Sequence, residues 1–455
     1  MWGNLLNKLR SALDKINNEK LRLNLLQALP FWIASLITGL IAVFYAKLFV
    51  WAESLSLAIT HKHGWLLFII TPACFLSAWW IVKKFARNAK GSGIPQVMAA
   101  IELANPKNNH LIDNLLSIKT IVIKIISSIL MVFGGGAIGR EGPTIQIAGS
   151  VFWKVNQLLP KSWPKISKKN MIITGAAAGL AAAFNTPLGG IVFGIEELAK
   201  THINYFKTAI FTSVIIAGLT AQGILGPYLY LGYPNVVGLS SYIFLFVIMV
   251  AIISGGLGTL MSKIILRILK WKANFKITRF EVLYVIGIAL IVAFIAYFIN
   301  QSILGSGRAE MSKVLFTENK YAGWQLPLMR IIGPVLSFTT GAAGGIFAPA
   351  LSAGAMVGSC IAELFRLGGP NANILILAGM VAFLTGVTKS PFTSSILVLE
   401  MTDRHNVIFH LMLAGIVASM ISGLIEKRSL YSHLEQQYLS EIYEEEAATA
   451  SKQDE

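Results

Sequence analysis

The sequence is poor in charge. Only 13% of its 455 residues are Asp, Glu, Lys or Arg, whereas soluble globular proteins carry about 25%. The mean hydropathy is +0.65, and long runs without any charge account for it. These runs cover residues 23–46, 64–82, 170–195, 208–262, 282–307, 331–362, 367–388 and 405–425. Since a membrane-spanning helix needs about 20 apolar residues, the runs exclude a soluble protein and predict an all-α polytopic membrane protein.

Cysteine is also scarce. The two residues, Cys74 and Cys360, both lie in apolar runs, which excludes a disulfide framework. The seven histidines show no ligand spacing, so we predict no metal and no cofactor. The first residues lack the compact apolar region and small-residue cleavage site of a signal peptide. Residues 1–28 instead alternate apolar and basic residues at helical spacing, which predicts an amphipathic helix on the cytoplasmic membrane surface.

The net charge of +16 does not require a nucleic-acid partner, because the positive-inside rule accounts for it. Lys and Arg cluster in short joints between the apolar runs, whereas residues 226–241 carry no charge. We therefore place 226–241 outside the cell and both termini in the cytoplasm, in a multi-pass protein of the cell membrane. The acidic residues 435–455 are predicted to form a solvated tail.

The chain repeats itself. "GAAAGLAAAFNTPLGGIVFGIEEL" at 175–198 aligns with "GMVAFLTGVTKSPFTSSILVLEMT" at 379–402, with an offset of 204 for both the Pro and the Glu. Gly139 and Gly345 match at an offset of 206. Duplicated, Gly/Pro-interrupted apolar segments are typical of transporters. We predict membrane repeats at 29–205 and 206–434, and the charges alone leave their relative orientation open.

Proline inside an apolar run breaks a helix, so Pro187 and Pro391 should each divide one run into two helices. A helix that begins inside the membrane turns free N–H groups and a partial positive charge toward its surroundings, which suits an anion. The alternative is that these prolines only kink helices in a packed bundle.

"GGGAIGREGP" at 134–143 places Arg140 and Glu141 in an otherwise uncharged run. Neutralisation of one by the other is one interpretation, although adjacent residues do not face each other. The match to GxGxxG lacks the surrounding strands and the acidic residue of a dinucleotide site. We favour a third interpretation, in which Glu141 lies at a helix start and its carboxylate occupies the place of an anion. Only the charged form competes, so protonation and anion binding become coupled.

"GSGIP" at 91–95, "GREGP" at 139–143, "GGIFAP" at 344–349 and Tyr431 occur in this order, and together they resemble the CLC chloride channel and transporter family. The resemblance implies two inverted repeats of tilted, broken helices and a homodimer with one pore in each subunit. It implies that Glu141 is the protonatable gate and that Glu197 is the internal proton-transfer acid. It also implies an anion site formed by the Ser92 hydroxyl, the backbone N–H groups of Ile346 and Phe347, and the Tyr431 hydroxyl.

The expected function is secondary antiport of chloride against protons, and the alternative is a passive chloride channel of the same family. The retained Glu197 favours antiport. An enzyme is not expected, because no nucleophile–base pair or metal cluster accompanies Glu141. The serine of "GSGIP" favours chloride, since relatives with proline there tend to prefer nitrate. Gln96 follows this motif where bacterial relatives often carry an acid, and no soluble regulatory domain is expected after Tyr431.

Overall fold

The computed structural model describes residues 14, 17–160, 162–199, 207–226, 229–275 and 277–451. In this part of the chain, nine helical segments are long and apolar enough to cross a membrane, which confirms the predicted polytopic helical class. The helices are α2 (Glu19–Lys62), α3 (Leu67–Phe85), α4 (Ile94–Glu102), α5 (Ile112–Leu115), α6 (Ile118–Phe133), α7 (Glu141–Gln157), α8 (Lys168–Phe184), α9 (Pro187–Phe193), α10 (Lys207–Leu225), α11 (Ile243–Ala273), α12 (Thr278–Phe298), α13 (Arg308–Phe316), α14 (Gln325–Thr339), α15 (Phe347–Leu364), α16 (Gly369–Thr388), α17 (Pro391–Thr402), α18 (Ile408–Ile425) and α19 (Leu430–Ser451).

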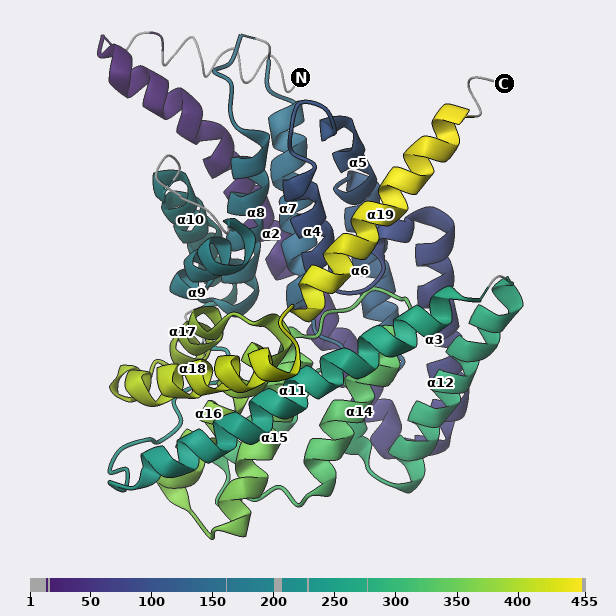
Figure 1. Ribbon diagram of the computed structural model, residues 1–455, viewed down its shortest axis with the longest axis vertical. Coiled ribbons are helices and arrows are strands. Elements are labelled where there is room, and N and C mark those ends of the chain that lie inside the picture. The colour runs from purple at the N-terminus through teal and green to yellow at the C-terminus, as the bar shows by residue number, and fades with distance from the viewer. Residues whose placement is uncertain are drawn as a thin grey trace.

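Figure 1 shows how the two halves of the chain are arranged. Most of the purple-to-teal helices lie in the upper part of the view, and most of the green helices lie in the lower part. The last helix, α19, returns to the upper part and packs against α4 (Figure 1). The end of the chain is therefore joined to its first half.

The predicted proline breaks are confirmed. Between α8 and α9, Asn185 adopts a left-handed conformation with φ +57°, and Pro187 is the first residue of α9. Between α16 and α17, Lys389 does the same with φ +64°, and Pro391 begins α17. A left-handed residue ends the first helix of each pair, and proline is well suited to the first position of the next.

The two repeats meet at equivalent positions. The N–H of Gly139 donates to the carbonyl of Gly345 at 2.8 Å, and the N–H of Gly345 donates to the carbonyl of Gly139 at 2.8 Å. The pairing is antiparallel. Two equivalent residues that bond each other in this reciprocal way lie across a local two-fold axis, as expected for inverted repeats.

The centre of the molecule depends on close backbone contact between α15 and α16. A Cβ atom on Gly379 would lie 2.2 Å from the carbonyl oxygen of Gly354, and one on Gly358 would lie 2.2 Å from that of Leu375. Such approach needs glycine, because any side chain would separate the helices. The packing fixes the start of α15, which forms part of the site described below.

Both ends of the chain lie partly outside the described residues. Most of 1–28 lies outside the described residues, and 19–28 form the first turns of α2. The described residues from 435 to 451 continue α19, in which Glu441 and Glu445 pair with Lys90 and Arg87 while residues 443–448 are exposed. The solvated tail stays a prediction, and the basic residues near 90 supply partners for two of its carboxylates.

Candidate functional site

Three helix starts and their preceding loops are joined at the centre of the molecule. Gly91, before α4, pairs with Ala343, before α15. The loop before α15 also pairs with Gly139, before α7. The glycine motifs of the sequence are therefore brought together by backbone hydrogen bonds, and the residues at the three helix starts face a common region.

Two hydroxyl groups lie in this region without ordinary partners. Ser92 is 1% exposed and Tyr431 is fully buried. Within the described residues neither Ser92 Oγ nor the Tyr431 hydroxyl makes a hydrogen bond of normal geometry, although the two lie close enough to influence each other. The Tyr431 ring is nearly parallel to that of Phe347, with centroids 6.1 Å apart. Buried hydroxyls normally find a partner, so these two favour a bound species that accepts hydrogen bonds.

The start of α15 adds backbone donors. Ile346 is the N-cap of this helix and Phe347 is its first residue, and both are buried. The first N–H groups of a helix have no partner within it, and they carry the positive end of its dipole. Together with the hydroxyls of Ser92 and Tyr431 they form a set of donors suited to an anion.

Glu141 is the first residue of α7 and is only 1% exposed. Its Oε1 receives a long contact of 3.5 Å from the Tyr230 hydroxyl, while Oε2 has no hydrogen-bond partner in the described part of the chain. The backbone amides of Glu141 and Ala348 and the charge of Arg140 act on the carboxylate. The carboxylate therefore lies between the starts of α7 and α15.

On one side, Glu141 borders a small cavity. Its other lining residues are Phe49, Val50, Glu53, Arg140, Tyr230, Ser306 and Arg308. On the side of Ser92, a cavity of about 520 Å³ extends from the Ser92 loop past α3, α11 and α19. A Cβ atom on Gly142 would lie 2.2 Å from Ser92 Oγ, so Gly142, next to Glu141, is in close contact with Ser92. The contact between Ser92 and Gly142 thus lies between the two cavities.

The larger cavity is electropositive. Its titratable lining residues are Lys83, Arg87, Lys90, Lys272, Glu281, Tyr438 and Glu441, of which four are basic and two are acidic. A cavity lined by an excess of one charge concentrates ions of the opposite charge. It therefore favours access of anions to Ser92.

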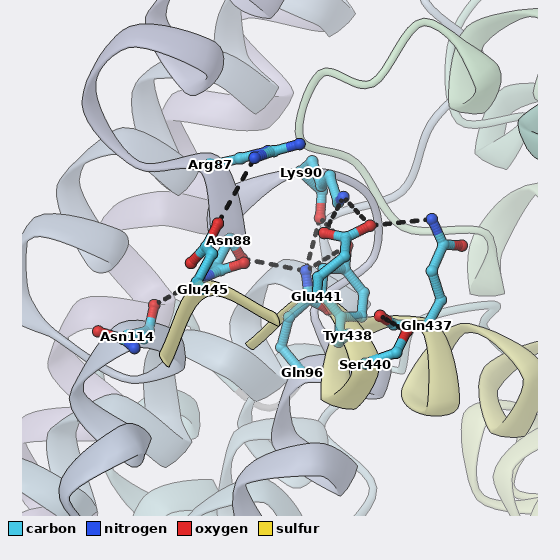
Figure 2. Close-up of polar contacts among 10 residues, drawn as sticks. All are labelled: Arg87, Asn88, Lys90, Gln96, Asn114, Gln437, Tyr438, Ser440, Glu441 and Glu445. Carbon is cyan, nitrogen blue, oxygen red and sulfur yellow. Dashed lines mark hydrogen bonds and ion pairs between the residues drawn. The ribbon is translucent and has the colours of Figure 1, made fainter. Parts of the chain in front are cut away.

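Helix α19 borders this cavity and bonds the Ser92 loop (Figure 2). Glu441 pairs with Lys90 at 2.8 Å, and Glu445 lies 3.5 Å from Arg87. The Tyr438 hydroxyl donates to the carbonyl of Lys90 at 3.2 Å and accepts from Gln96 Nε2 at 3.0 Å. Burial, with the nearby charge of Glu441, raises the pKa of Tyr438 well above its usual value, so its hydroxyl stays protonated as a donor. The helix that carries Tyr431 is thereby fixed to the loop that carries Ser92.

Lys124 was not predicted from the sequence as a functional residue. This side chain of α6 is fully buried, and its ammonium donates to the carbonyls of Ala89 and Gly91, each at 2.9 Å. It therefore holds the backbone that leads to Ser92. Lys124 lies in the interior of α6, five residues after Lys119, and its position was the available signal, since a charge inside a membrane helix is expensive and marks a functional position.

Glu197 lies in a π-helical segment, Gly194–Ala199, that follows α9. It is 5% exposed and accepts a hydrogen bond from the Ser390 hydroxyl. Both Glu197 and Glu141 act electrostatically on the Tyr431 hydroxyl. No group of three or more metal-ligating side chains occurs among the described residues.

These features define a class: a polytopic membrane protein with an anion-suited donor set where broken helices meet, next to a buried carboxylate. The comparisons give the family. Residues 73–423 match the profile described as "Voltage gated chloride channel", and the chain belongs to that family.

Curated relatives cover almost the whole chain. The "H(+)/Cl(-) exchange transporter ClcA" of Salmonella paratyphi A is 29% identical over 430 residues, covering 90% of this chain and 88% of the relative. The protein of the same name from Citrobacter koseri is 29% identical over 434 residues, covering 91% and 89%.

Solved structures share the fold. A slow cyanobacterial Cl⁻/H⁺ antiporter aligns with a TM-score of 0.79 at 22% identity, covering 91% of this chain and 98% of that one. A CLC-type fluoride/proton antiporter aligns with a TM-score of 0.76 at 18% identity, covering 91% and 98%. The chain therefore has the CLC fold that the sequence motifs predicted.

Proposed function

We propose that this chain is a secondary antiporter that exchanges chloride for protons across the membrane. The observation that carries the proposal is the pair of buried hydroxyls, Ser92 and Tyr431, beside the Glu141 carboxylate and without ordinary hydrogen-bond partners in the described structure. The names of the curated relatives, which are proton/chloride exchange transporters, support the same function.

In this mechanism, chloride is held by the Ser92 and Tyr431 hydroxyls and by the N–H groups of Ile346 and Phe347. The charged Glu141 carboxylate competes with chloride for the positive helix starts. When Glu141 takes up a proton, it loses its attraction to these donors, and the anion can pass. Glu197 exchanges protons with the cytoplasmic side. Each cycle therefore links anion movement to proton movement, with no chemical conversion of either.

The polytopic membrane location follows from the helices and the family. We further propose the cell membrane, with both termini in the cytoplasm, because the cavity beside Ser92 is rich in Lys and Arg and would face inward by the positive-inside rule. We also propose a homodimer, repeats at 29–205 and 206–434, and no nucleic-acid partner. Chemical cross-linking in liposomes tests the dimer.

The test is a reversal-potential measurement in lipid bilayers at a fixed chloride gradient and varied pH. We expect the potential to depend on pH, and Glu141→Gln and Glu197→Gln to abolish proton movement while chloride flux continues. Glu363→Gln, at an exposed carboxylate of α15, is the matched control. A potential set by chloride alone in the unmodified protein would instead establish a passive channel.

A further inference from the structure

Two neighbouring carboxylates of the first repeat meet the start of α17 in the second repeat. Glu196 accepts the backbone N–H of Phe392 at 3.2 Å, and both the N–H and the hydroxyl of Thr393, at 2.6 and 2.7 Å. These bonds satisfy donors that a helix start leaves free. Glu196 is therefore the cap of α17, and Glu197 is left for another role.

The same cap exists at the equivalent place in the other half. Glu400 accepts the N–H groups of Leu188 at 3.0 Å and Gly189 at 2.7 Å, at the start of α9. Glu196 and Glu400 thus cap each other's repeat, at the offset of 204 found in the sequence. This reciprocal cap is architectural, because both halves have it.

The hydroxyl–carboxylate pair of Ser390 and Glu197 occurs in only one of the two places. At an offset of 204, Ser390 corresponds to Thr186 and Glu197 corresponds to Met401. Thr186 has almost the same backbone, with φ −128° and ψ 83° against −117° and 81°. Its hydroxyl is nevertheless without a hydrogen-bond partner in the described part of the structure. A helix break of this kind therefore forms without the bond that Ser390 makes.

Ser390 is also not needed as a side-chain cap. It occupies the N-cap position of α17, but its hydroxyl makes no capping bond within that helix and donates to Glu197 instead. Both residues are at most 5% exposed, so water does not replace the contact easily. The bond joins elements 193 residues apart and fixes the direction of one carboxylate oxygen.

We propose that Ser390 is a positioning residue for proton transfer at Glu197, an inference that rests on the proposed antiport. Its hydroxyl keeps its own proton and donates a hydrogen bond to the charged carboxylate. A proton binds Glu197 from the cytoplasmic side and leaves toward Glu141, and the hydrogen bond orients the carboxylate for both steps. Because a bond to the charged form favours that form, it also eases release of the proton.

The other charged or titratable groups near Ser390 and Glu197 are directed toward other partners. Glu196 is committed to the cap of α17, and the Tyr431 hydroxyl faces the anion site. The ammonium of Lys389 donates to the Thr259 hydroxyl at 3.2 Å and to the carbonyl of Ser422 at 3.0 Å. Among the described residues, Glu196, Tyr431 and Lys389 are therefore the charged or titratable groups whose effect on the pH response of Glu197 must be considered, and each is directed elsewhere.

The experiment measures proton and chloride flux in liposomes from pH 3 to pH 8, a range that extends to both sides of the usual glutamate pKa of about 4.3. Ser390→Ala should slow proton-coupled exchange about 10-fold, which is less than the roughly 10²–10⁴-fold effect of removing a proton-transfer group, because the carboxylate itself remains. It should also shift the pH midpoint upward by about one unit, because the charged form loses a donor. Ser390→Thr should restore both, and the matched control Thr186→Val should change neither.

Glu197→Gln distinguishes a failure of the proposed role of Ser390 from a failure of the proposed role of Glu197 in antiport. If Glu197→Gln is uncoupled while Ser390→Ala keeps the rate and pH profile of the unmodified protein, the role of Ser390 is refuted and antiport stands. If Glu197→Gln remains fully coupled, the proposed function of Glu197 fails first. Should Ser390→Ala not yield folded protein, Ser390→Cys, whose thiol is a weak donor, carries the same expectation.

Discussion

Replacing Gly142 with alanine tests whether Ser92 binds the anion. Gly142 is the second residue of α7, where alanine would favour the helix by about 0.5–1 kcal/mol. The added Cβ, however, would lie 2.2 Å from Ser92 Oγ and 2.9 Å from the Ser92 carbonyl oxygen. Ser92 must move by about 1 Å to restore ordinary contact distances. The substitution therefore displaces one proposed ligand without removing any polar group.

The expected loss follows from one hydrogen bond. A hydrogen bond to a charged partner contributes about 1.5–3 kcal/mol, which corresponds to a roughly 10- to 150-fold weaker affinity for chloride. Isothermal titration calorimetry of chloride on purified protein measures it. Gly149→Ala in the same helix is the matched control, because its Cβ would come no closer than 3.4 Å to Val97.

A comparison with Ser92→Ala makes the test specific. If both substitutions act on the same bond, their combination should cost no more than either one alone, because residues in contact are not additive. Chloride affinity equal to that of the Gly149→Ala control, in a folded Gly142→Ala protein, would refute the assignment of Ser92 as a ligand. Fully additive losses would show that Gly142 acts elsewhere.

Two further outcomes follow from buried or cavity-lining charges. Glu441→Gln leaves Lys90 without its 2.8 Å partner and makes the larger cavity more positive. Chloride uptake from that side should rise about two- to threefold at low salt and return to normal near 1 M salt, because salt screens the added charge. A change that does not depend on salt would contradict the electrostatic account. Arg330→Met removes the donors to the buried carbonyls of Ser302, Leu304 and Gly305. We expect the free energy of unfolding to fall by about 3 kcal/mol, measured as a lower thermal unfolding temperature in detergent. Arg279→Met, at an exposed position, is the control and should leave the unfolding temperature unchanged.

Much of the architecture could be predicted because it is local. The uncharged runs predicted most of the spans, but not Asn109–Phe133, which carries charged residues. Pro187 and Pro391 predicted the helix breaks, since proline acts on its own neighbours. The glycine motifs identified the residues around the anion site. That these residues lie together in space was predicted only from the family resemblance, because their spacing in the sequence left the relative orientation of the repeats open.

The remaining features depend on contacts between distant residues. The bond from Ser390 to Glu197 spans 193 residues, and the pair of Lys90 and Glu441 spans 351. Acidic composition alone therefore could not predict the ion pairs that Glu441 and Glu445 form with Lys90 and Arg87. Lys124 was visible as a charge in the interior of α6, but its carbonyl acceptors lie on another element.

The reciprocal caps have a consequence for biogenesis. The start of α9 is synthesised 212 residues before Glu400, which binds the N–H of Leu188. At roughly 5–20 residues per second, the ribosome needs about 10–40 s to supply that carboxylate. During this interval the nascent first repeat holds an unfinished helix end in the insertion machinery or the bilayer. The first repeat thus waits for translation of the second, whereas the cap of α17, Glu196, already exists when α17 is made. The completed chain, rather than the single repeat, is therefore the unit in which both helix starts are satisfied.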